Sequence, residues 1–357
     1  MTQPSGYVLE TLRESAEFTL YRGRQPGNLL TVLVVALSAE QSSPQSLRRL
    51  EHEYSLAAEL DPTWAAPPLE LTRHEGRTML VLKDPGGEPL DWVLDRDQSQ
   101  PLELSRFLRI AIGLATALGK VHQNGLIHKN VKPANVLVDE AGNVWLTGFG
   151  IASRLPRERQ APAPPEVIAG TLAYMAPEQT GRMNRSIDAR SDLYALGVIF
   201  YEMLTGDLPF TGTDPLELVH CHVARRAVPP SERIPAVPLA VSAIVMKLLA
   251  KTAEDRYQTA AGVVADLRRC LSEWESNGRI ELFTPGAHDT PDVLRIPEKL
   301  YGRQPEVSTL LAAFERVVSS GTPELVLVSG YSGIGKSSVV NELQRVLRSG
   351  FFAAGKT

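Results

Sequence analysis

Residues 126–150 read LIHKNVKPANVLVDEAGNVWLTGFG, and this stretch decides the fold. Its second half holds two short apolar runs, residues 136–138 and 144–146, on either side of a turn of Glu, Ala, Gly and Asn. β-Branched and apolar runs around such a turn predict a β-hairpin. The first half is a loop of charged and amide side chains around a histidine. The sequence therefore predicts a polar loop and a closing Gly-Phe-Gly at the two ends of one hairpin.

This stretch resembles the catalytic and metal-binding loops of protein kinases, whose usual pattern is H-R-D-x-K-P-x-N followed by D-F-G. The residues that match the pattern are His128, Lys132, Pro133, Asn135, Phe149 and Gly150. Both aspartates are replaced, because Asn130 occupies the position of the catalytic base and Gly148 that of the metal ligand. The resemblance implies a protein-kinase fold whose catalytic set is broken.

Later motifs follow in the order that the family uses. Residues 170–178, GTLAYMAPE, resemble the end of the kinase activation segment, and Glu178 closes the A-P-E motif. The resemblance makes Arg256 the partner of Glu178, and Asp192 the buried aspartate that holds the catalytic loop. It also places His128 and Phe149 in an internal hydrophobic spine. These roles are structural, and their retention beside a lost catalytic set is the pattern of a pseudokinase.

The predicted small lobe departs further from the family. Kinases cover the ATP phosphates with G-x-G-x-x-G, because glycine lets backbone amides approach phosphate closely. The corresponding positions hold Arg13, Ser15 and Phe18. Val35 stands where the resemblance expects the strand lysine that grips the phosphates, and Glu53 is its usual helix partner, left without a cation. Arg22 or Lys129 would have to substitute for that lysine.

These replacements decide what chemistry to expect. The amide oxygen of Asn130 is too weakly basic to accept a hydroxyl proton, and loss of a general base typically lowers the rate by ~10²–10⁴. With Gly148 in place, Asn135 is the remaining protein ligand for a metal, and a weak one. Lys132, whose family role is to steady the transferring phosphate, does not restore the site. We therefore expect neither ATP nor Mg²⁺ to bind well in the kinase cleft, although a divergent active serine/threonine kinase stays open as an alternative.

The hydrophobic pattern gives the domain organisation. Strand patterns at residues 18–22, 30–37 and 78–82 and a helical one at 44–60 predict a small lobe, residues 7–85. Helical patterns at residues 105–123, 192–204, 215–223, 240–250 and 260–274 predict a large lobe, residues 88–275. Gly86 and Gly87 mark the hinge. Residues 276–299 mix Gly, Pro, Asp and Thr, and we interpret them as a linker.

A second motif follows this linker. Residues 330–337, GYSGIGKS, fit the phosphate-binding loop G-x-x-x-x-G-K-[ST], between an apolar strand pattern at 324–328 and a helical one at 336–347. Backbone amides there cradle phosphates, Lys336 reaches the outer phosphates and the Ser337 hydroxyl binds Mg²⁺. The predicted nucleotide-binding residues are Gly330, Ser332, Gly333, Gly335, Lys336, Ser337 and Ser338. ATP and Mg²⁺ are the cofactors expected at this loop.

Residues 301–303, YGR, resemble the entry to ATPase domains of the AAA/STAND type. We thus expect an α+β bilobal protein-kinase fold at residues 7–275, then a truncated α/β P-loop βαβ unit at 300–357, the first part of an ATPase domain. The order resembles the N-terminal part of large bacterial signalling proteins that continue with helical repeats, a GAF sensor and a histidine kinase. It implies a regulatory or docking module whose partners are other domains or proteins of such a system. A nucleotide switch working through Lys336 is a third hypothesis.

The bulk composition excludes several other classes. The chain has 357 residues and is 43% hydrophobic, enough to bury a sizeable core. A net charge of −4 gives no electrostatic case for nucleic acid as a partner. No apolar run reaches the ~20 residues that span a bilayer. Two cysteines support neither a disulfide framework nor a cysteine zinc site, so we expect a reduced, cytoplasmic setting.

Overall fold

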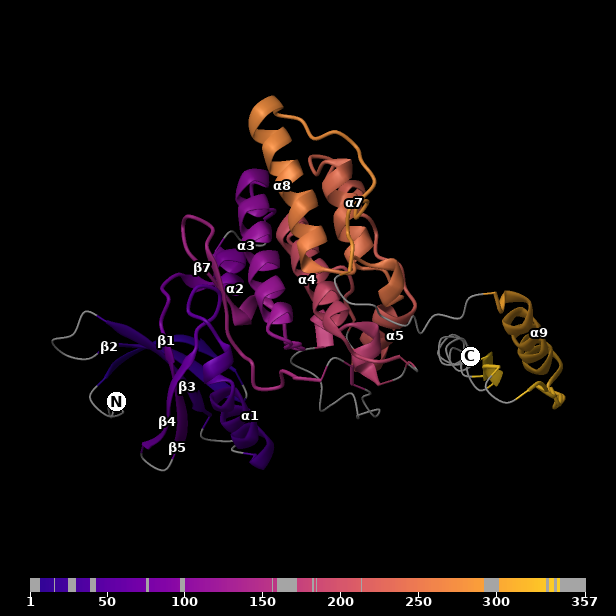
Figure 1. Cartoon of the computed structure of the whole chain (residues 1–357), viewed down its shortest axis with the longest axis horizontal. Helices are drawn as coiled ribbons and strands as arrows, with labels where there is room; N and C mark the ends of the chain where they lie inside the picture. Colours follow the sequence, from indigo (N-terminus) through magenta and orange to yellow (C-terminus); the bar gives the residue numbers. More distant parts are fainter. Residues whose placement is uncertain are drawn as a thin grey trace.

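Two lobes of different secondary structure make up most of the chain, a sheet lobe and a helical lobe (Figure 1). The computed structural model describes residues 7–15, 17–24, 30–38, 43–74, 77–96, 100–155, 157–158, 172–181, 183, 185–212, 214–291, 302–331, 334–336 and 339–340. Short 3₁₀ helices connect the main elements at Ala57–Glu59, Pro133–Asn135, Leu172–Tyr174, Pro177–Thr180 and Ala253–Asp255. The expected α+β fold with two lobes is confirmed.

The small lobe is a five-stranded antiparallel sheet in the order β1-β2-β3-β5-β4. Its strands are β1 (Val8–Glu14), β2 (Phe18–Arg24), β3 (Thr31–Leu37), β4 (Pro68–His74) and β5 (Arg77–Lys83). Side chains alternate between the faces of a strand, so Leu33 and Leu37 of β3 share one buried cluster with Leu50 of helix α1 (Pro44–Ser55). The strands at β2, β3 and β5 match the prediction. The edge strands β1 and β4, which the sequence analysis missed, have weaker apolar patterns because most of their residues are not buried.

The hinge passes into a small second sheet in the order β6-β7-β8. Strands β7 (Val136–Val138) and β8 (Val144–Leu146) form the predicted hairpin, and β6 (Glu88–Pro89) pairs with β7. Gly87 has φ +75°, and a Cβ there would lie 2.7 Å from the Val138 carbonyl oxygen. Glycine is therefore required where the hinge passes the hairpin. Helix α2 (Leu90–Arg96) follows directly.

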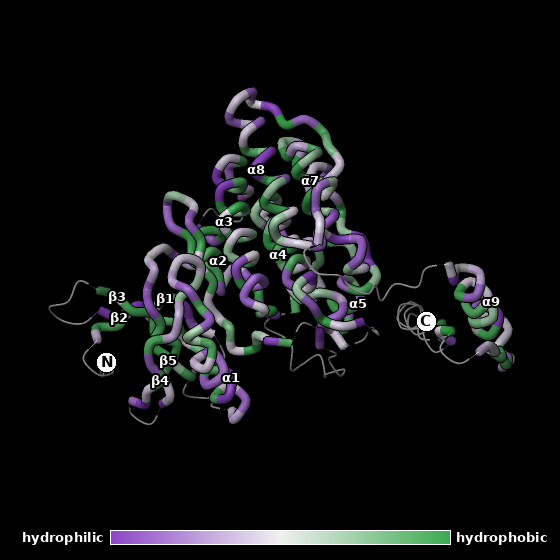
Figure 2. Tube along the Cα trace, viewed as in Figure 1, coloured by the Kyte–Doolittle hydropathy of each residue, from purple (hydrophilic) through white to green (hydrophobic). Residues whose placement is uncertain are grey.

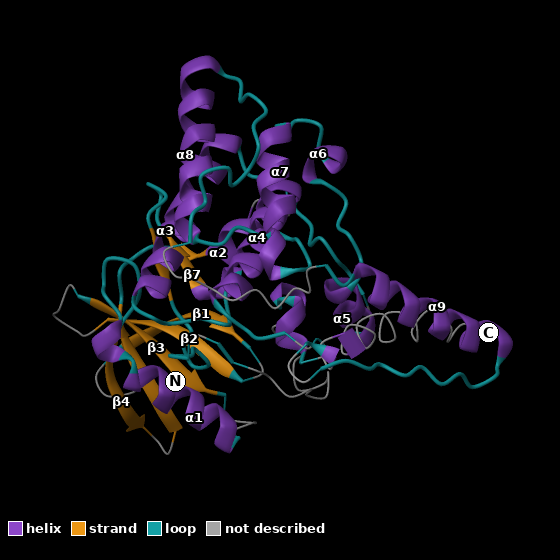
Figure 3. Cartoon of the chain, turned by 45° about the vertical axis from the view of Figure 1, so that its right-hand side comes forward, coloured by secondary structure: helices purple, strands orange, loops and turns teal. Residues whose placement is uncertain are grey.

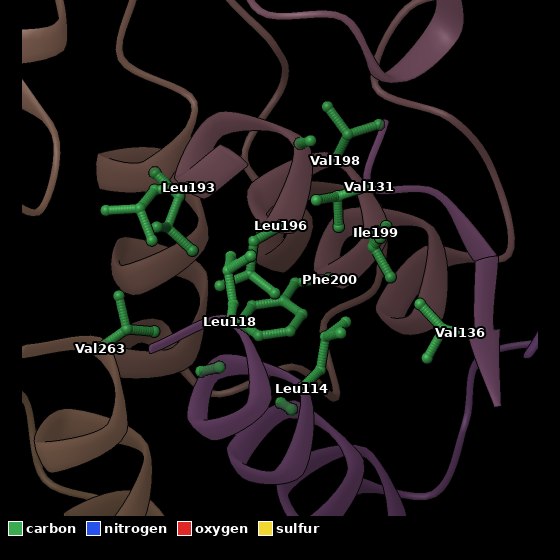
Figure 4. Close-up of a cluster of buried hydrophobic side chains, with 14 of the residues drawn as sticks. Leu114, Leu118, Val131, Val136, Leu193, Leu196, Val198, Ile199, Phe200 and Val263 are labelled. Carbon is green, nitrogen blue, oxygen red and sulfur yellow. The ribbon is translucent and has the colours of Figure 1, made fainter. Parts of the chain in front are cut away.

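Helices build the large lobe around α4 (Ala189–Thr205), which is apolar along most of its length (Figures 2 and 3). The others are α3 (Leu104–Gln123), α5 (Pro215–Val223), α6 (Pro230–Arg233), α7 (Leu239–Leu248) and α8 (Ala260–Asn277). Side chains from α3, α4 and α8 meet in one core that includes Leu118, Phe200 and Val263 (Figure 4). The helical character predicted for this part of the chain is confirmed. No helix of the described residues is long and apolar enough to cross a membrane.

The C-terminal part departs from the expectation in one respect. Helix α9 (Gln304–Ser320) is present, but the predicted strand at residues 324–328 is irregular chain. Leu325 and Leu327 are 94% and 86% exposed. The strand prediction is wrong for this structure, because a strand needs a hydrogen-bonded neighbour and the described residues around it provide none.

A buried ion pair ties the end of the activation segment to the helical lobe. The two terminal guanidinium nitrogens of Arg256, Nη1 and Nη2, donate to the Glu178 carboxylate, at 2.7 and 2.8 Å. The Arg256 side chain is 0% exposed and that of Glu178 is 4% exposed. The Ser191 hydroxyl donates to the same carboxylate at 2.7 Å. The pairing that the motif implies is thus formed, and its polar atoms have partners.

Replacing Arg256 by alanine is expected to lower the free energy of unfolding by about 3–5 kcal/mol, because it leaves the Glu178 carboxylate buried and unpaired. Urea denaturation of the full chain measures this. Arg279→Ala is the control, since its pair with Glu281 is exposed on both sides and should contribute at most ~1 kcal/mol. Equal costs for the two variants would contradict the structural role of the buried pair.

Candidate functional site

Asp192 of α4 fixes the loop that carries the matched polar residues. Its carboxylate accepts hydrogen bonds from the backbone amides of His128, at 2.9 Å, and Lys129, at 2.8 Å. His122 Nε2 lies 3.0 Å from the same carboxylate. Lys129 has φ +62°, an uncommon backbone conformation for a residue with a side chain. The carboxylate therefore holds the loop in a strained turn.

The rings of His128 and Phe149 pack against each other at an interplanar angle of 49°, with centroids 4.5 Å apart, and Trp64 packs edge-on against Phe149. His128 Nε2 lies 3.0 Å from the Thr147 carbonyl oxygen, and the Asn130 amide donates to Nδ1. A carbonyl can only accept, so Nε2 carries the proton and Nδ1 is the acceptor. Burial lowers the pKa of His128, which fits this neutral tautomer. The residue is a packing and positioning group.

Asn130 occupies the position expected for the base. Its backbone oxygen accepts from Asn135 Nδ2 at 2.9 Å. Its side-chain oxygen Oδ1 is buried and has no hydrogen-bond partner within the described residues. An amide oxygen does not take up a proton at neutral pH, so this side chain supplies no general base.

Gly148 and Asn135 are packed against each other where the resemblance expects two metal ligands. Gly148 has φ +77°, and a Cβ built there would lie 2.6 Å from Asn135 Nδ2 and 2.9 Å from Oδ1. Real Cβ atoms do not approach other atoms that closely, so the Asn135 side chain fills the space that a residue 148 side chain would need. A metal held jointly from these two positions does not fit this arrangement.

Val35 and Glu53 do not form the pair that grips phosphates in the family. Val35 packs against the apolar core of the small lobe. Glu53 is 5% exposed and accepts a hydrogen bond from the Gly148 amide at 3.1 Å. Burial raises the pKa of Glu53 to about 7, and hydrogen bonds from the amides of Phe149, Gly148 and Gly150 oppose the rise. Glu53 thus holds the Gly-Phe-Gly backbone instead of a lysine.

The two suggested substitutes for the lysine are engaged elsewhere. Arg22 pairs with Asp84 at 2.7 Å and donates to the Gly87 carbonyl at 2.7 Å, so it braces the hinge. Lys129 pairs with Glu158 at 2.8 Å. Neither replaces the missing cation beside Glu53.

Arg13 crosses from the small lobe to the large lobe. Its guanidinium donates to the backbone oxygen of Ala134, in the catalytic loop, and lies 3.7 Å from the Asp91 carboxylate of α2. Burial lowers the pKa of Arg13, and Asp91 opposes this. Burial also lowers the pKa of Lys132, with a further contribution from Arg13. The sequence analysis missed the role of Arg13 and Asp91. The sequence signal that could have indicated this role was Arg13 itself, a long cationic side chain at a position where the family has glycine.

Helix α1 and the 3₁₀ helix that follows it, Ala57–Glu59, make further contacts with the segment after Gly-Phe-Gly. His52 Nε2 lies 2.7 Å from the Ala152 carbonyl oxygen, and Arg154 pairs with Glu59 at 2.6 Å. Together with the Glu53 contact, these bonds fix the small lobe against residues 148–154.

The phosphate-binding motif is described only in part. Gly330 and Gly335 have positive φ, +156° and +91°, and Lys336 Nζ donates to the carbonyl oxygens of Gly330 and Tyr331, at 2.9 Å each. The Lys336 ammonium thus folds back onto the first residues of the motif. Ser332, Gly333, Ser337 and Ser338 lie outside the described residues.

Comparisons with known proteins agree with this geometry. A family model described as a protein kinase domain matches residues 24–266, and one described as an AAA ATPase domain matches residues 299–357. Serine/threonine-protein kinase PknB of Mycobacterium tuberculosis is 40% identical over 169 residues, which cover 47% of this chain and 27% of that protein. A probable serine/threonine-protein kinase of Corynebacterium efficiens is 36% identical over 218 residues, 60% of this chain and 32% of that protein.

A relative of another architecture matches a longer part of the chain. Hybrid signal transduction histidine kinase G of Dictyostelium discoideum is 29% identical over 328 residues, 68% of this chain and 10% of that protein. The chain therefore spans about a third or less of the length of each of these relatives.

The raised pKa of Glu53 predicts a pH dependence of stability. Between its ordinary value of 4.5 and about 7, the folded state holds a proton that the unfolded state has lost, so stability falls as pH rises through this window. The loss amounts to about 3 kcal/mol. Glu53→Gln should remove this part of the pH dependence, measured by urea denaturation from pH 4 to 8. Glu51→Gln, on the exposed side of the same helix, should track the wild type; parallel curves for wild type and Glu53→Gln would refute the assignment.

Restoring the family aspartate by Gly148→Asp should destabilise the fold by about 1–3 kcal/mol, through overpacking against Asn135. Adding Asn135→Ala should recover part of that loss, a coupling that a double-mutant cycle measures. Gly125→Asp is the matched control, because Gly125 has φ +73° but no atom lies within 4 Å of the position that its Cβ would take. A single Gly148→Asp variant that is as stable as the control would show that Asn135 does not block the position.

Proposed function

Because this chain belongs to the protein kinase family, we propose that its kinase-like domain is a catalytically impaired pseudokinase. In this proposal the domain serves as a regulatory or docking module in a larger ATP-binding sensor kinase of a bacterial signalling system. The kinase relatives and the hybrid histidine kinase support a signalling context.

The observation that carries the proposal is the contact between Gly148 and Asn135. Phosphoryl transfer depends on metal ions that neutralise charge on the phosphates. The position of the metal-binding aspartate has no side chain, and Asn135 fills the space beside it. Asn130 supplies no general base. Metal binding and proton transfer are therefore both impaired in this proposal, and the domain has few groups left that could stabilise the transition state.

Arg13 supports the same conclusion from the other side of the cleft. Its contacts with Ala134 and Asp91 span the two lobes at the level of the catalytic loop. A nucleotide phosphate entering there would have to displace these contacts, and the sequence has no glycine at the aligned positions to receive it. We therefore propose that ATP and Mg²⁺ bind at Lys336 in the phosphate-binding loop and not in the kinase cleft.

A divergent active serine/threonine kinase is the second candidate. It is favoured by the retained Lys132 and Asn135 and by a catalytic loop that Asp192 still holds in place. The identity with serine/threonine kinases favours it too. A nucleotide switch at Lys336 is the third candidate, and it can coexist with a pseudokinase.

Incubation of the full chain with radiolabelled ATP, Mg²⁺ and a generic acceptor protein separates the first two candidates. We expect the wild type to transfer no more phosphate to the acceptor protein than the Asn135→Ala variant does. The same chain is then heated with ATP, with and without Mg²⁺. Any rise in Tm caused by ATP should disappear in Lys336→Ala and persist in Asn135→Ala, because a ligand stabilises only through the site that binds it.

Phosphotransfer that depends on Asn135 would sink the pseudokinase proposal and favour the active kinase. A rise in Tm that survives Lys336→Ala but not Asn135→Ala would place the nucleotide in the kinase cleft and contradict the proposed division of roles.

A further inference from the structure

The chain after α8 is an ordered extension of the large lobe. Helix α8 ends at Gly278, which has φ +63°, and residues 278–290, here called the strap, turn back along the lobe beside α7 and α8 (Figures 1 and 3). Ile280 and Phe283 pack against the large-lobe core, and the Arg269 guanidinium lies 4.3 Å from the Phe283 ring centroid. The strap lies beyond residues 24–266, which match the protein kinase domain.

Two carboxylates anchor the strap. Asp266 of α8 accepts a hydrogen bond from the Gly286 amide at 2.6 Å and one from the Tyr257 hydroxyl at 2.5 Å. Asp289 of the strap accepts hydrogen bonds from the amides of Gln258 and Thr259 and from the Thr259 hydroxyl, the last at 2.7 Å. These amides lie at the N-terminus of α8, where a negative charge is stabilised by the helix. Hydrogen bonds to a carboxylate are charge-assisted and therefore stronger than hydrogen bonds between neutral groups.

Gly262 is shaped to receive Asp289. A Cβ at residue 262 would lie 2.5 Å from the Asp289 carboxylate. Gly262 stands in the first turn of α8, where alanine would be the better helix former. Because Gly262 has no side chain, the strap can pack closely against the N-terminus of α8.

Gln258, whose amide Asp289 holds, is linked through Arg256 to the end of the activation segment. The Gln258 side chain accepts a hydrogen bond from Arg190 at 2.9 Å and donates one to the Arg256 carbonyl oxygen at 2.9 Å. Arg256 is the buried partner of Glu178. Asp289 is therefore linked to Glu178 by hydrogen bonds that the backbones and side chains of Gln258 and Arg256 connect.

We propose that the strap couples the chain that follows the kinase-like domain to the end of the activation segment. Displacement of the strap releases the amides of Gln258 and Thr259, and the change passes through Arg256 and Arg190 to residues 176–181 and 187–191. Residues 176–181 are buried, so the change acts on the packing at the end of the activation segment. The inference concerns regulation and holds whether or not the cleft is catalytic.

Hydrogen–deuterium exchange of the full chain tests the coupling. Asp289→Ala should raise exchange at Gln258 and Thr259 about tenfold, the effect of losing a charge-assisted hydrogen bond. It should also raise exchange in residues 176–181 and 187–191 by about twofold or more, as coupling between linked sites implies. Gly262→Ala displaces Asp289 without removing it and should give the same distant change, although alanine favours the helix itself.

Glu281→Ala is the control, because its side chain pairs with exposed Arg279 and lies on the same strap. It should leave both regions unchanged. Exchange that rises only at residues 257–262 in Asp289→Ala and Gly262→Ala would overturn the coupling and leave the strap as a local clamp. An equal distant change in Glu281→Ala would overturn the specific role of Asp289. If Asp289→Ala does not fold, Gly262→Ala alone decides between these outcomes.

Discussion

The buried carboxylate of Asp192 is the constraint on which the cleft depends. It is 1% exposed and holds the amides of two consecutive loop residues, one of which, Lys129, has a strained positive φ. Without this acceptor, buried amides would lose their partner, and the desolvation cost would fall on the loop that carries Asn130, Lys132 and Asn135. The contact orders backbone and takes no part in chemistry. It can therefore be retained in a chain in which Asn130 and Gly148 stand in place of the two aspartates of the family pattern.

Several polar side chains between the lobes contact the backbone or a neighbouring side chain. The family resemblance implies that the same positions would instead contact nucleotide or metal. Glu53 accepts backbone amides of the Gly-Phe-Gly turn, and Asn135 fills the space beside Gly148. Each contact is compatible with its neighbours, because a carboxylate at residue 148 would disturb Asn135 and a lysine at residue 35 would compete for Glu53. The replacements thus form a consistent set rather than separate losses. This mutual consistency supports the proposed pseudokinase.

The sequence predicted the fold because its strongest signals are local. The hairpin and the helices of the large lobe follow from local periodicity, whereas the Glu178–Arg256 pair, 78 residues apart, follows from the family resemblance. Arg13 could not be assigned in this way, since its partner Ala134 is 121 residues away and only the folded chain brings them together. The strap was interpreted as part of a linker for a similar reason. Its sequence contains Gly and Pro, as linkers do, and the contacts of Asp266 and Asp289 that hold it in place form only in the folded chain. The strand expected at residues 324–328 failed because strand propensity is not sufficient without a neighbouring strand.

Contacts across the cleft explain how the lobes can hold one arrangement without a nucleotide. Arg13 reaches Ala134 and Asp91, Arg22 braces the hinge, and Glu53 holds the Gly148 amide. In an enzyme, a ligand shifts the balance between open and closed lobes only by binding one state better than the other. Here side chains of the chain itself join the two lobes. In the proposed regulatory module, the place where the strap meets the N-terminus of α8 offers a route by which the rest of the chain acts on the large lobe.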